Sequence, residues 1–502
     1  MTKLNGKKMK LILRKLVSTA LITTIALSVA SCCQTDEIQM TITDQSSQSD
    51  ITAEDPDVTT INFAVANYCY VEDKNLKLFN EELKKDGHKY RLQLKQFDDD
   101  GENGEYYKVI ENELRSGNVD VAYLGGDDGS SEFIGLFNSG ALLDLDEIIT
   151  TEKGKELYEA FPKAWWERVR FNGHTYSIPS PTPVTGGLFA AFNKDYLSDE
   201  VIENWDGSLE GIYEIVKNTK WDYDVPRFQY LTSYYLFENM LGCDIQDGLL
   251  YDYDTMKIEN PLESEKLINY IKLLNQMKNE GLMPKSVSYA GNTAYITEKE
   301  NLESGKFLVV LSDSEPEDYL LKSNISIKQV PRYLPSQIAD SIGISKNTDK
   351  LDAVIDFLGI LYGEEKYGNL LLYGKQDVDY KLKDGYVADV DGTERERFYN
   401  YFTKSCLNLF INTHPVKGEG FVINRKEEYF SYFDSAKVSP FAGFHPISDK
   451  RTVISQDFDD FMDSITATNL DQIVKKYKEK LKTDGMDEHL SAARKQWEEY
   501  NK

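Results

Sequence analysis

The residue whose chemistry the sequence indicates most directly is Cys32. It follows the small residues Val29-Ala30-Ser31, after a basic start and an apolar run over residues 16–30. Small residues before a cysteine at this place are typical of a bacterial lipoprotein signal, in which the thiol receives a diacylglycerol group. The sequence therefore predicts a signal peptide over residues 1–31 and a lipid-anchored mature chain on the outer face of the cytoplasmic membrane.

Two other interpretations of this segment stay open. Cys33 is a competing lipid site, although Ala30-Ser31-Cys32 before the cleavage point fits the pattern less well. The apolar run could also be an uncleaved membrane helix, although it is nearer to the ~15 residues of a signal core than to the ~20 of a spanning helix.

No catalytic or metal-binding motif is present in the rest of the sequence. It contains no Gly-x-Ser-x-Gly, no His-Glu-x-x-His, no phosphate-binding loop and no clustered His and Cys residues. We therefore expect no catalytic residue, no metal site and no cofactor. The five histidines are far apart in the sequence: His88, His174, His414, His445 and His489.

The net charge limits the partners that the chain is expected to bind, and the spacing of its cysteines indicates whether they form disulfides. Without the six basic residues of the signal, 51 Lys and Arg face 84 Asp and Glu, a formal charge of −33. Such a surface repels phosphate backbones, so nucleic acid is not an expected partner. Cys33, Cys69, Cys243 and Cys406 lack paired spacing and are interpreted as isolated thiols, with pairing of two of them as the alternative in an exported protein.

The periodicity predicts a parallel sheet covered by helices. A polar, acidic tether over residues 32–58 precedes strands at 59–66, 89–97 and 119–124, with helical spacing between them at 76–83 and 106–114. Alternating strands and helices indicate an α/β fold, in which ligands gather at the carboxyl ends of the strands.

The second half of the chain extends this pattern. Residues 195–335 are aromatic and are expected to be dominated by helices, although residues 307–311 read as a strand. A further strand is expected at 338–344, a helix at 351–362 and closing helices over 470–500.

Several short motifs occur in an order that resembles the extracellular solute-binding proteins, family 1, which serve ABC importers and mainly bind sugars. They span nearly the whole mature chain and are residues 66–68, 114–121, 139–145, 173–179, 192–197, 342–347, 373–374 and 380–385.

This resemblance implies an α/β, two-lobed periplasmic-binding-protein-like (type II) fold with an interlobe cleft. It places lobe 1 at 59–186 plus 339–374 and lobe 2 at 187–338 plus 375–502. Gly186 and Gly187 would lie in a hinge crossover, or in an ordinary turn at the sheet edge. The implied function is capture of a sugar by a monomeric, non-enzymatic lipoprotein that delivers it to an ABC permease.

The resemblance also implies which side chains contact the ligand. A sugar needs aromatic rings against its apolar face and carboxylates for its hydroxyls. Core packing is the alternative for the rings and helix capping for the aspartates next to Gly126. The predicted ligand-binding residues are Tyr68, Tyr70, Asp127, Asp128, Tyr234, Tyr235, Asp313, Phe444 and His445.

Two departures and two other function classes qualify the implied ligand. Ser312-Asp313 lacks a nearby tryptophan, and Gly186-Gly187 lacks the acidic residue of maltose-type binders, so maltodextrin is not expected. A peptide or organic anion is the alternative ligand, with Arg227 and Arg332 as isolated anion contacts. A secreted polysaccharide hydrolase needs two carboxylates about 5 to 10 Å apart, which 84 acidic residues can supply.

Overall fold

A computed structural model describes most of the chain beyond the signal and the tether. The described residues are 43–44, 57–67, 69, 71–98, 105–125, 131–179, 189–231, 240–284, 300–312, 320, 322–330, 333–334, 341–393, 407, 413–416, 427, 430, 437–465 and 470–502. Cys32 and its predicted signal lie outside them. Ile42–Lys502 forms one compact unit.

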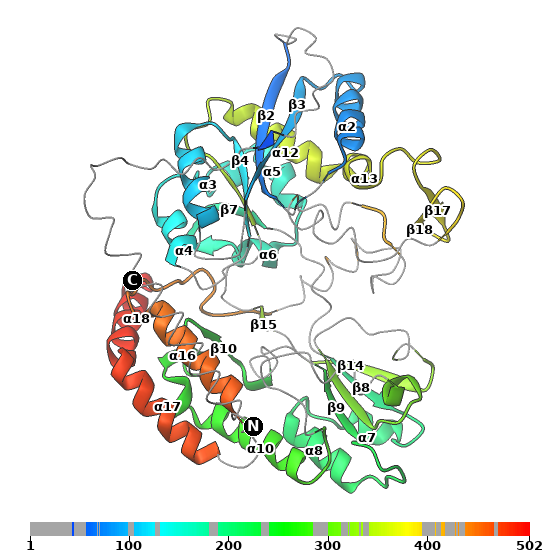
Figure 1. Cartoon of the computed structure of the whole chain (residues 1–502), viewed down its shortest axis with the longest axis vertical. Helices are drawn as coiled ribbons and strands as arrows, with labels where there is room; N and C mark the ends of the chain where they lie inside the picture. The colour runs from blue at the N-terminus through cyan, green and yellow to red at the C-terminus, as the bar shows by residue number, and fades with distance from the viewer. Residues whose placement is uncertain are drawn as a thin grey trace, which may run out of the picture. The chain divides into compact units, whose positions relative to one another are not determined.

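A six-stranded sheet organises the first lobe (Figure 1). Its strand order is β1-β3-β2-β4-β16-β7, in which β2 runs parallel to both β3 and β4, and β16 is antiparallel to β4 and β7. The strands are β1 (Thr43–Asp44), β2 (Thr59–Ala66), β3 (Tyr90–Phe97), β4 (Val121–Gly125), β7 (Ser177–Pro179) and β16 (Ser341–Ile344).

Amphipathic helices pack on this sheet and on one another. In α2 (Asp73–Lys85) the buried Leu76, Phe79 and Leu83 recur at helical spacing, and Phe79 meets Phe357 and Tyr367 edge to face. These two rings belong to α12 and α13, so helices from distant parts of the chain share one core. The other elements are α3 (Glu105–Ser116), α4 (Ser131–Asn138), η2 (Ile148–Thr150), α5 (Glu152–Glu159), α6 (Lys163–Glu167), α12 (Leu351–Gly363) and α13 (Glu365–Tyr373).

The second lobe is built on a four-stranded sheet that is buried on both faces. Alternate residues of β8 pack into different clusters: Ala190 and Phe192 on one side, Phe189 and Ala191 on the other. The strand order is β14-β8-β13-β9. The strands are β8 (Phe189–Asn193), β9 (Phe228–Leu231), β13 (Val309–Ser312) and β14 (Ile325–Gln329).

A three-stranded antiparallel sheet and a group of helices complete the second lobe. Its first two strands, β10 (Cys243–Gln246) and β11 (Leu249–Asp252), are joined by the two-residue turn Asp247-Gly248, and β12 (Lys257–Glu259) follows. The helices are α7 (Asp199–Glu203), α8 (Leu209–Asn218), η3 (Pro261–Glu263), α10 (Glu265–Asn279), α16 (Arg451–Ser464), α17 (Leu470–Asp484) and α18 (Met486–Tyr500).

Three small strand pairs lie outside these sheets. The pairs are β5 (Arg170–Phe171) with β6 (His174–Thr175), β17 (Lys381–Lys383) with β18 (Tyr386–Ala388), and β15 (Tyr333–Leu334) with β19 (Lys437–Val438).

Most predicted elements of the first lobe are confirmed, but the middle of the chain differs. The predicted strands and helices correspond to β2, α2, β3, α3, β4, β16 and α12, and the closing helices to α17 and α18. Residues 195–335, expected to be dominated by helices, contain α7, α8 and α10 but also the strands β9 to β14, of which only β13 was predicted. These strands are three to five residues long, too short for a clear period, and the Asp-Gly pair is the turn signal that sequence reasoning missed.

Two further expectations, on the lobe boundary and on the cysteines, differ from what the structure shows. The family resemblance assigns residues from 375 onward to the second lobe, whereas Tyr380, Val387 and Val416 pack in the core of the first. The interpretation of all cysteines as isolated thiols is wrong for Cys69, which is disulfide-bonded to a residue outside the described ones. Among the described residues, no helix has the length and apolar character needed to span a membrane.

Candidate functional site

In the first lobe, several neighbouring strands have their terminal residues at the same end of the sheet. Ser341, the first residue of β16, pairs with both Gly125 at the end of β4 and Pro179 at the end of β7. β2 ends in the same direction, since Ala66 pairs with the last residue of β3, Phe97. In a parallel sheet this is the side on which ligands bind.

The second lobe has a corresponding set of strand ends. Ser312, the last residue of β13, pairs with Phe189 of β8 and with Leu231, the last residue of β9. Phe189 also pairs with Gln329 at the end of β14. The chain passes from one set to the other between Pro179 and Phe189 and again between Gln329 and Ser341, and it returns to the core of the second lobe between Val416 and Phe441.

Most predicted ligand and hinge residues fall in segments that begin at these strand ends. Each of them lies outside the described residues, so the structure neither gathers nor separates them, and their roles stay predictions. Seven are predicted ligand contacts and two are hinge glycines: Tyr68, Tyr70, Asp127, Asp128, Tyr234, Tyr235, Asp313, Gly186 and Gly187.

The described residues around Tyr68 and Tyr70 are held against β3. Asn67 donates its backbone N–H to the carbonyl of Phe97 at 2.8 Å, and Cys69 donates its own to Ala66 at 2.9 Å. The Gln96 amide donates to the Cys69 carbonyl at 2.9 Å. These bonds fix Asn67 and Cys69 next to the end of β2.

Two tyrosines that sequence reasoning missed lie near the end of β4. A Cβ atom at Gly125 would be 3.7 Å from the Tyr107 hydroxyl and 3.8 Å from the Tyr123 hydroxyl. Tyr107 is on α3 and packs edge to face on Phe133. Strand alternation indicates that Tyr123 and Gly125 share a face of the sheet, but the approach of Tyr107 from a helix has no sequence signal.

The remaining two predicted ligand residues, Phe444 and His445, are both 1% exposed. Phe444 packs on Trp497 and Tyr500 of α18. The Gln246 amide lies 2.9 Å from His445 Nδ1. Both side chains thus make contacts with other protein side chains, and their assignment as ligand contacts stays a prediction.

This segment joins the cores of the two lobes. The His445 ring stacks on Phe171 of β5, with 5.5 Å between centroids and 5° between planes. Asn172 donates its backbone N–H to Gly443 at 2.5 Å and accepts the N–H of His445 on its side-chain oxygen at 3.2 Å. Phe171 belongs to the core of the first lobe and Phe444 to that of the second, so this contact connects them.

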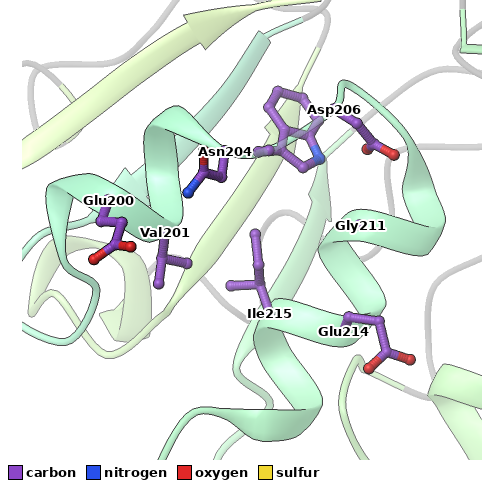
Figure 2. A pocket seen from close by; sticks show the side chains of 8 residues that line it. Glu200, Val201, Asn204, Asp206, Gly211, Glu214 and Ile215 are labelled. Carbon is purple, nitrogen blue, oxygen red and sulfur yellow. The ribbon is translucent and has the colours of Figure 1, made fainter.

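A pocket of about 410 Å³ lies elsewhere on the second lobe, between α7 and α8 (Figure 2). None of the predicted ligand residues lines it. Carboxylates from both helices and the loop between them surround an indole and two aliphatic side chains. Its lining residues are Glu200, Val201, Asn204, Trp205, Asp206, Gly211, Glu214 and Ile215.

The structure also brings together one group of potential metal ligands, although the sequence predicts none. Asp144, Asp146 and His174 place their ligand atoms within 4.8 Å of one another. Burial, with the charges of Asp144 and Asp146, raises the pKa of the nearby Tyr176. Sequence reasoning missed this group because nearly thirty residues separate His174 from the aspartates.

Comparison with known proteins adds evidence on the fold. No protein-family model matches the chain, and no curated protein matches it in sequence. Solved structures do match. The N-glycan transport solute binding protein NgtS of Streptococcus pneumoniae has a TM-score of 0.58 at 20% identity, covering 88% of this chain and 98% of that one. Its complex with Man1GlcNAc has a TM-score of 0.51 at 20% identity, covering 88% and 99%.

A third similar structure comes from another organism. It is the HMO-binding, ABC-transporter-associated solute binding protein of Bifidobacterium longum infantis, with a TM-score of 0.51 at 16% identity and coverage of 87% and 98%. The likeness extends over nearly the full length of each of these proteins. The chain therefore has the two-lobed α/β fold of the solute-binding proteins, as its sequence motifs predicted.

Proposed function

We propose that this chain is the substrate-binding lipoprotein of an ABC importer and that it binds an oligosaccharide between its two lobes. The observation that carries the proposal is the chain-length likeness in fold to NgtS, a protein of N-glycan transport. The structure with Man1GlcNAc and the HMO-binding protein point to the same ligand class.

The mechanism follows from two lobes joined by chain crossovers. A ligand that contacts both sets of strand ends favours the closed arrangement, whereas one that touches a single lobe shifts nothing. Closure changes the surface offered to the permease. Tyrosine rings and aspartates next to the strand ends suit the apolar face and the hydroxyls of a sugar.

A ligand screen tests the proposal. The compact unit from residue 42 onward is melted alone and with N-glycan fragments, milk oligosaccharides, maltodextrins, short peptides and organic acids. A ligand at a hundred times its dissociation constant adds about 2.7 kcal/mol of stability. We expect a shift with glycan fragments, recovered intact by mass spectrometry; a response to peptides or acids alone would overturn the ligand class, and turnover of any sugar would indicate the hydrolase.

Variants then locate the site. Tyr68→Ala and Asp127→Ala, each two residues after a strand in the sequence (β2 and β4), are expected to weaken sugar binding measured by calorimetry. Tyr223→Ala is the matched control, because this tyrosine is 42% exposed and follows α8 rather than a strand end. Equal loss in all three variants would contradict the placement of the site at the strand ends.

Lipid anchoring is the second part of the proposal. It rests on the sequence before Cys32 and explains how a chain with a strongly acidic surface stays at a membrane. Metabolic labelling with radioactive palmitate should mark the wild type and not Cys32→Ala, which should appear in the medium. Unchanged labelling in Cys32→Ala, with loss in Cys33→Ala, would move the anchor by one residue.

A further inference from the structure

A histidine and two aspartates of the first lobe converge away from the proposed sugar site. His174 Nδ1 lies 2.9 Å from Asp144 Oδ2 and 3.3 Å from Asp146 Oδ2. The aspartates follow Leu143, whose N–H binds the carbonyl of Ile344. Ile344 is the last residue of β16, whereas the strand ends of the sugar site meet at its first residue, Ser341.

The backbone holds both carboxylates in place. Asp144 Oδ1 accepts the N–H of Asp146 at 3.0 Å, and Asp146 Oδ1 accepts the N–H of Thr175 at 3.1 Å. The second oxygen of each carboxylate is the one that faces His174. Leu145 also donates to the Thr175 carbonyl at 2.8 Å, which fixes the aspartate segment against β6, the strand that carries the histidine.

We propose that Asp144, Asp146 and His174 bind a zinc ion. Zinc bonds to histidine nitrogen and carboxylate oxygen of 2.0 to 2.2 Å put neighbouring ligand atoms of a tetrahedral ion about 3.3 to 3.6 Å apart. His174 Nδ1 already lies 3.3 Å from the Asp146 oxygen, and the 2.9 Å to the Asp144 oxygen has to widen by only a few tenths of an ångström. Imidazole suits zinc better than calcium or magnesium, which prefer oxygen ligands.

The exposure of the group determines the rest of the coordination shell. The side chains of His174, Asp144 and Asp146 are 54%, 43% and 38% exposed, so the ion enters from solvent and water completes its shell. Zinc takes the lone pair of Nδ1, and the one ring proton of the neutral imidazole is then carried by Nε2. The bound ion links the aspartate segment to the β5–β6 hairpin.

Titration of the purified full-length protein with zinc tests the site. We expect one ion per chain by calorimetry, and visible absorption when cobalt replaces zinc. His174→Ala and Asp146→Asn should each weaken zinc binding at least tenfold, in the range that perturbed metal sites show.

His414→Ala is the matched control. His414 Nδ1 lies 2.9 Å from Glu365 Oε1, a pair with no third metal ligand among the described residues. This variant should bind zinc as the wild type does. Because His174 is on the surface, His174→Ala should fold, which its melting curve without metal verifies.

Three results would overturn the proposal. These are equal zinc affinity of wild type and His174→Ala, no cobalt absorption in excess metal, or displacement of zinc by an equal concentration of calcium. The zinc site does not depend on the proposed sugar binding, so failure of either leaves the other to its own test.

Discussion

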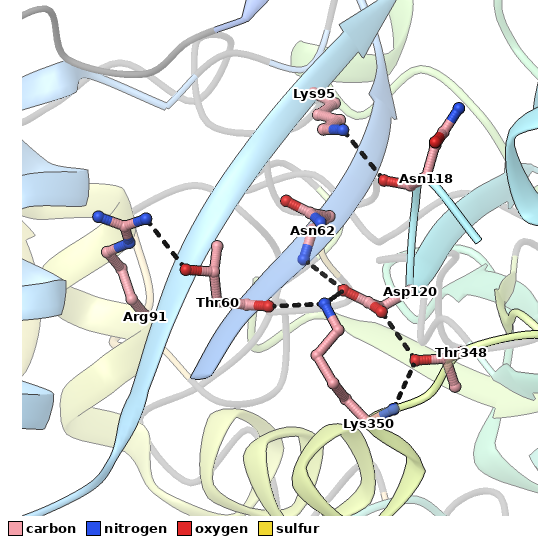
Figure 3. Close-up of polar contacts among 8 residues, drawn as sticks. All are labelled: Thr60, Asn62, Arg91, Lys95, Asn118, Asp120, Thr348 and Lys350. Atoms are coloured by element: carbon pink, nitrogen blue, oxygen red, sulfur yellow. Dashed lines mark hydrogen bonds and ion pairs between the residues drawn. The ribbon is translucent and has the colours of Figure 1, made fainter. Parts of the chain in front are cut away.

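Lys350 and Asp120 form an ion pair at the centre of the first lobe, with 2.7 Å between Nζ and Oδ2 (Figure 3). The Asp120 side chain is fully buried and that of Lys350 is 28% exposed. Asp120 also accepts the N–H of Asn62 at 2.9 Å and the hydroxyl of Thr348 at 2.7 Å. One carboxylate thus ties β2, the start of β4 and the segment after β16 together.

Removal of this carboxylate should destabilise the first lobe. Asp120→Ala removes the ion-pair partner of Lys350, whose ammonium keeps its hydrogen bond to the Thr60 carbonyl, and it removes the acceptor of the Asn62 N–H. Removal of one partner of a fully buried ion pair costs about 3 to 5 kcal/mol, and the partial exposure of Lys350 puts the expected loss at the lower end of that range. We expect a loss of this size in the free energy of unfolding, measured by urea denaturation.

Glu82→Gln is the control for this prediction. Lys85 Nζ lies 2.8 Å from Glu82 Oε1, but both side chains are on the surface of α2. Exposed ion pairs contribute little, so the free energy of unfolding should hardly change. If both substitutions lowered the free energy of unfolding equally, burial of Asp120 would not increase the contribution of its ion pair to stability.

Gly248 should be intolerant of a side chain for two separate reasons. Its φ of +71° disfavours any residue with a Cβ, and that Cβ would lie 2.8 Å from both the Ile454 carbonyl and the Ile454 Cγ2. The left-handed conformation costs about 1 to 2 kcal/mol and overpacking about 1 to 3 kcal/mol. Gly248→Ala should therefore lower the free energy of unfolding by the sum of both.

Gly281→Ala separates the two causes. This glycine has the same φ of +71°, but nothing lies within 4 Å of its Cβ position. Only the conformational cost of about 1 to 2 kcal/mol should appear in denaturant titrations. If both variants lost the same stability, contact with Ile454 would contribute nothing.

The sequence predicted the first lobe well because its elements carry long, regular patterns. Residues 59–66 are apolar or β-branched at every position except Asn62 and form β2, which lies between β3 and β4. The second lobe was predicted less well since β10, β11 and β12 are only three or four residues long. Strands of that length are set by pairing with neighbours that are distant in sequence.

The candidate sites differ in the same way. The ends of β2 and β4 followed from the order of strands, so residues next to them could be named from the sequence. The contact of His174 with Asp144 depends on the turn at Asn172 and Gly173, where φ is 47° and 90°. Only the folded hairpin brings these side chains together.

Acid should destabilise the protein through His489. This histidine is fully buried, and its burial lowers its pKa. The hydrogen bond to the Asp247 carbonyl at 3.0 Å raises the pKa, and the positive charge of Arg451 lowers it further. The unfolded chain then binds a proton more readily than the folded one. Stability is therefore lost as the pH falls below the ordinary value of about 6.5.

Urea denaturation between pH 7.5 and 5 measures this effect. A single group of this kind changes the free energy of unfolding by at most about 1.4 kcal/mol per pH unit. His489→Gln keeps a polar side chain without the titration and should flatten that part of the profile. A parallel displacement of the two profiles, with the same slope, would assign the acid sensitivity to other groups.

Cys69 is expected to pair with Cys406. Cys69 is 2% exposed in the core of the first lobe and is disulfide-bonded, whereas Cys243 carries a buried thiol outside any disulfide. Of the other cysteines, Cys406 directly precedes Leu407, which is buried in the same core as Cys69. Cys32 and Cys33 belong to the predicted lipidation segment instead.

Peptide mapping without reducing agent should recover the Cys69 and Cys406 peptides as one species. Loss of a native disulfide costs about 2 to 5 kcal/mol, so Cys69→Ala and Cys406→Ala should each lower the melting temperature, and the double variant should lose no more than either. Cys33→Ala should leave it unchanged. Recovery of Cys69 linked to Cys33 would contradict the Cys69–Cys406 pairing. Such a bond would instead join the tether to the end of β2, because Cys69 lies three residues beyond that strand.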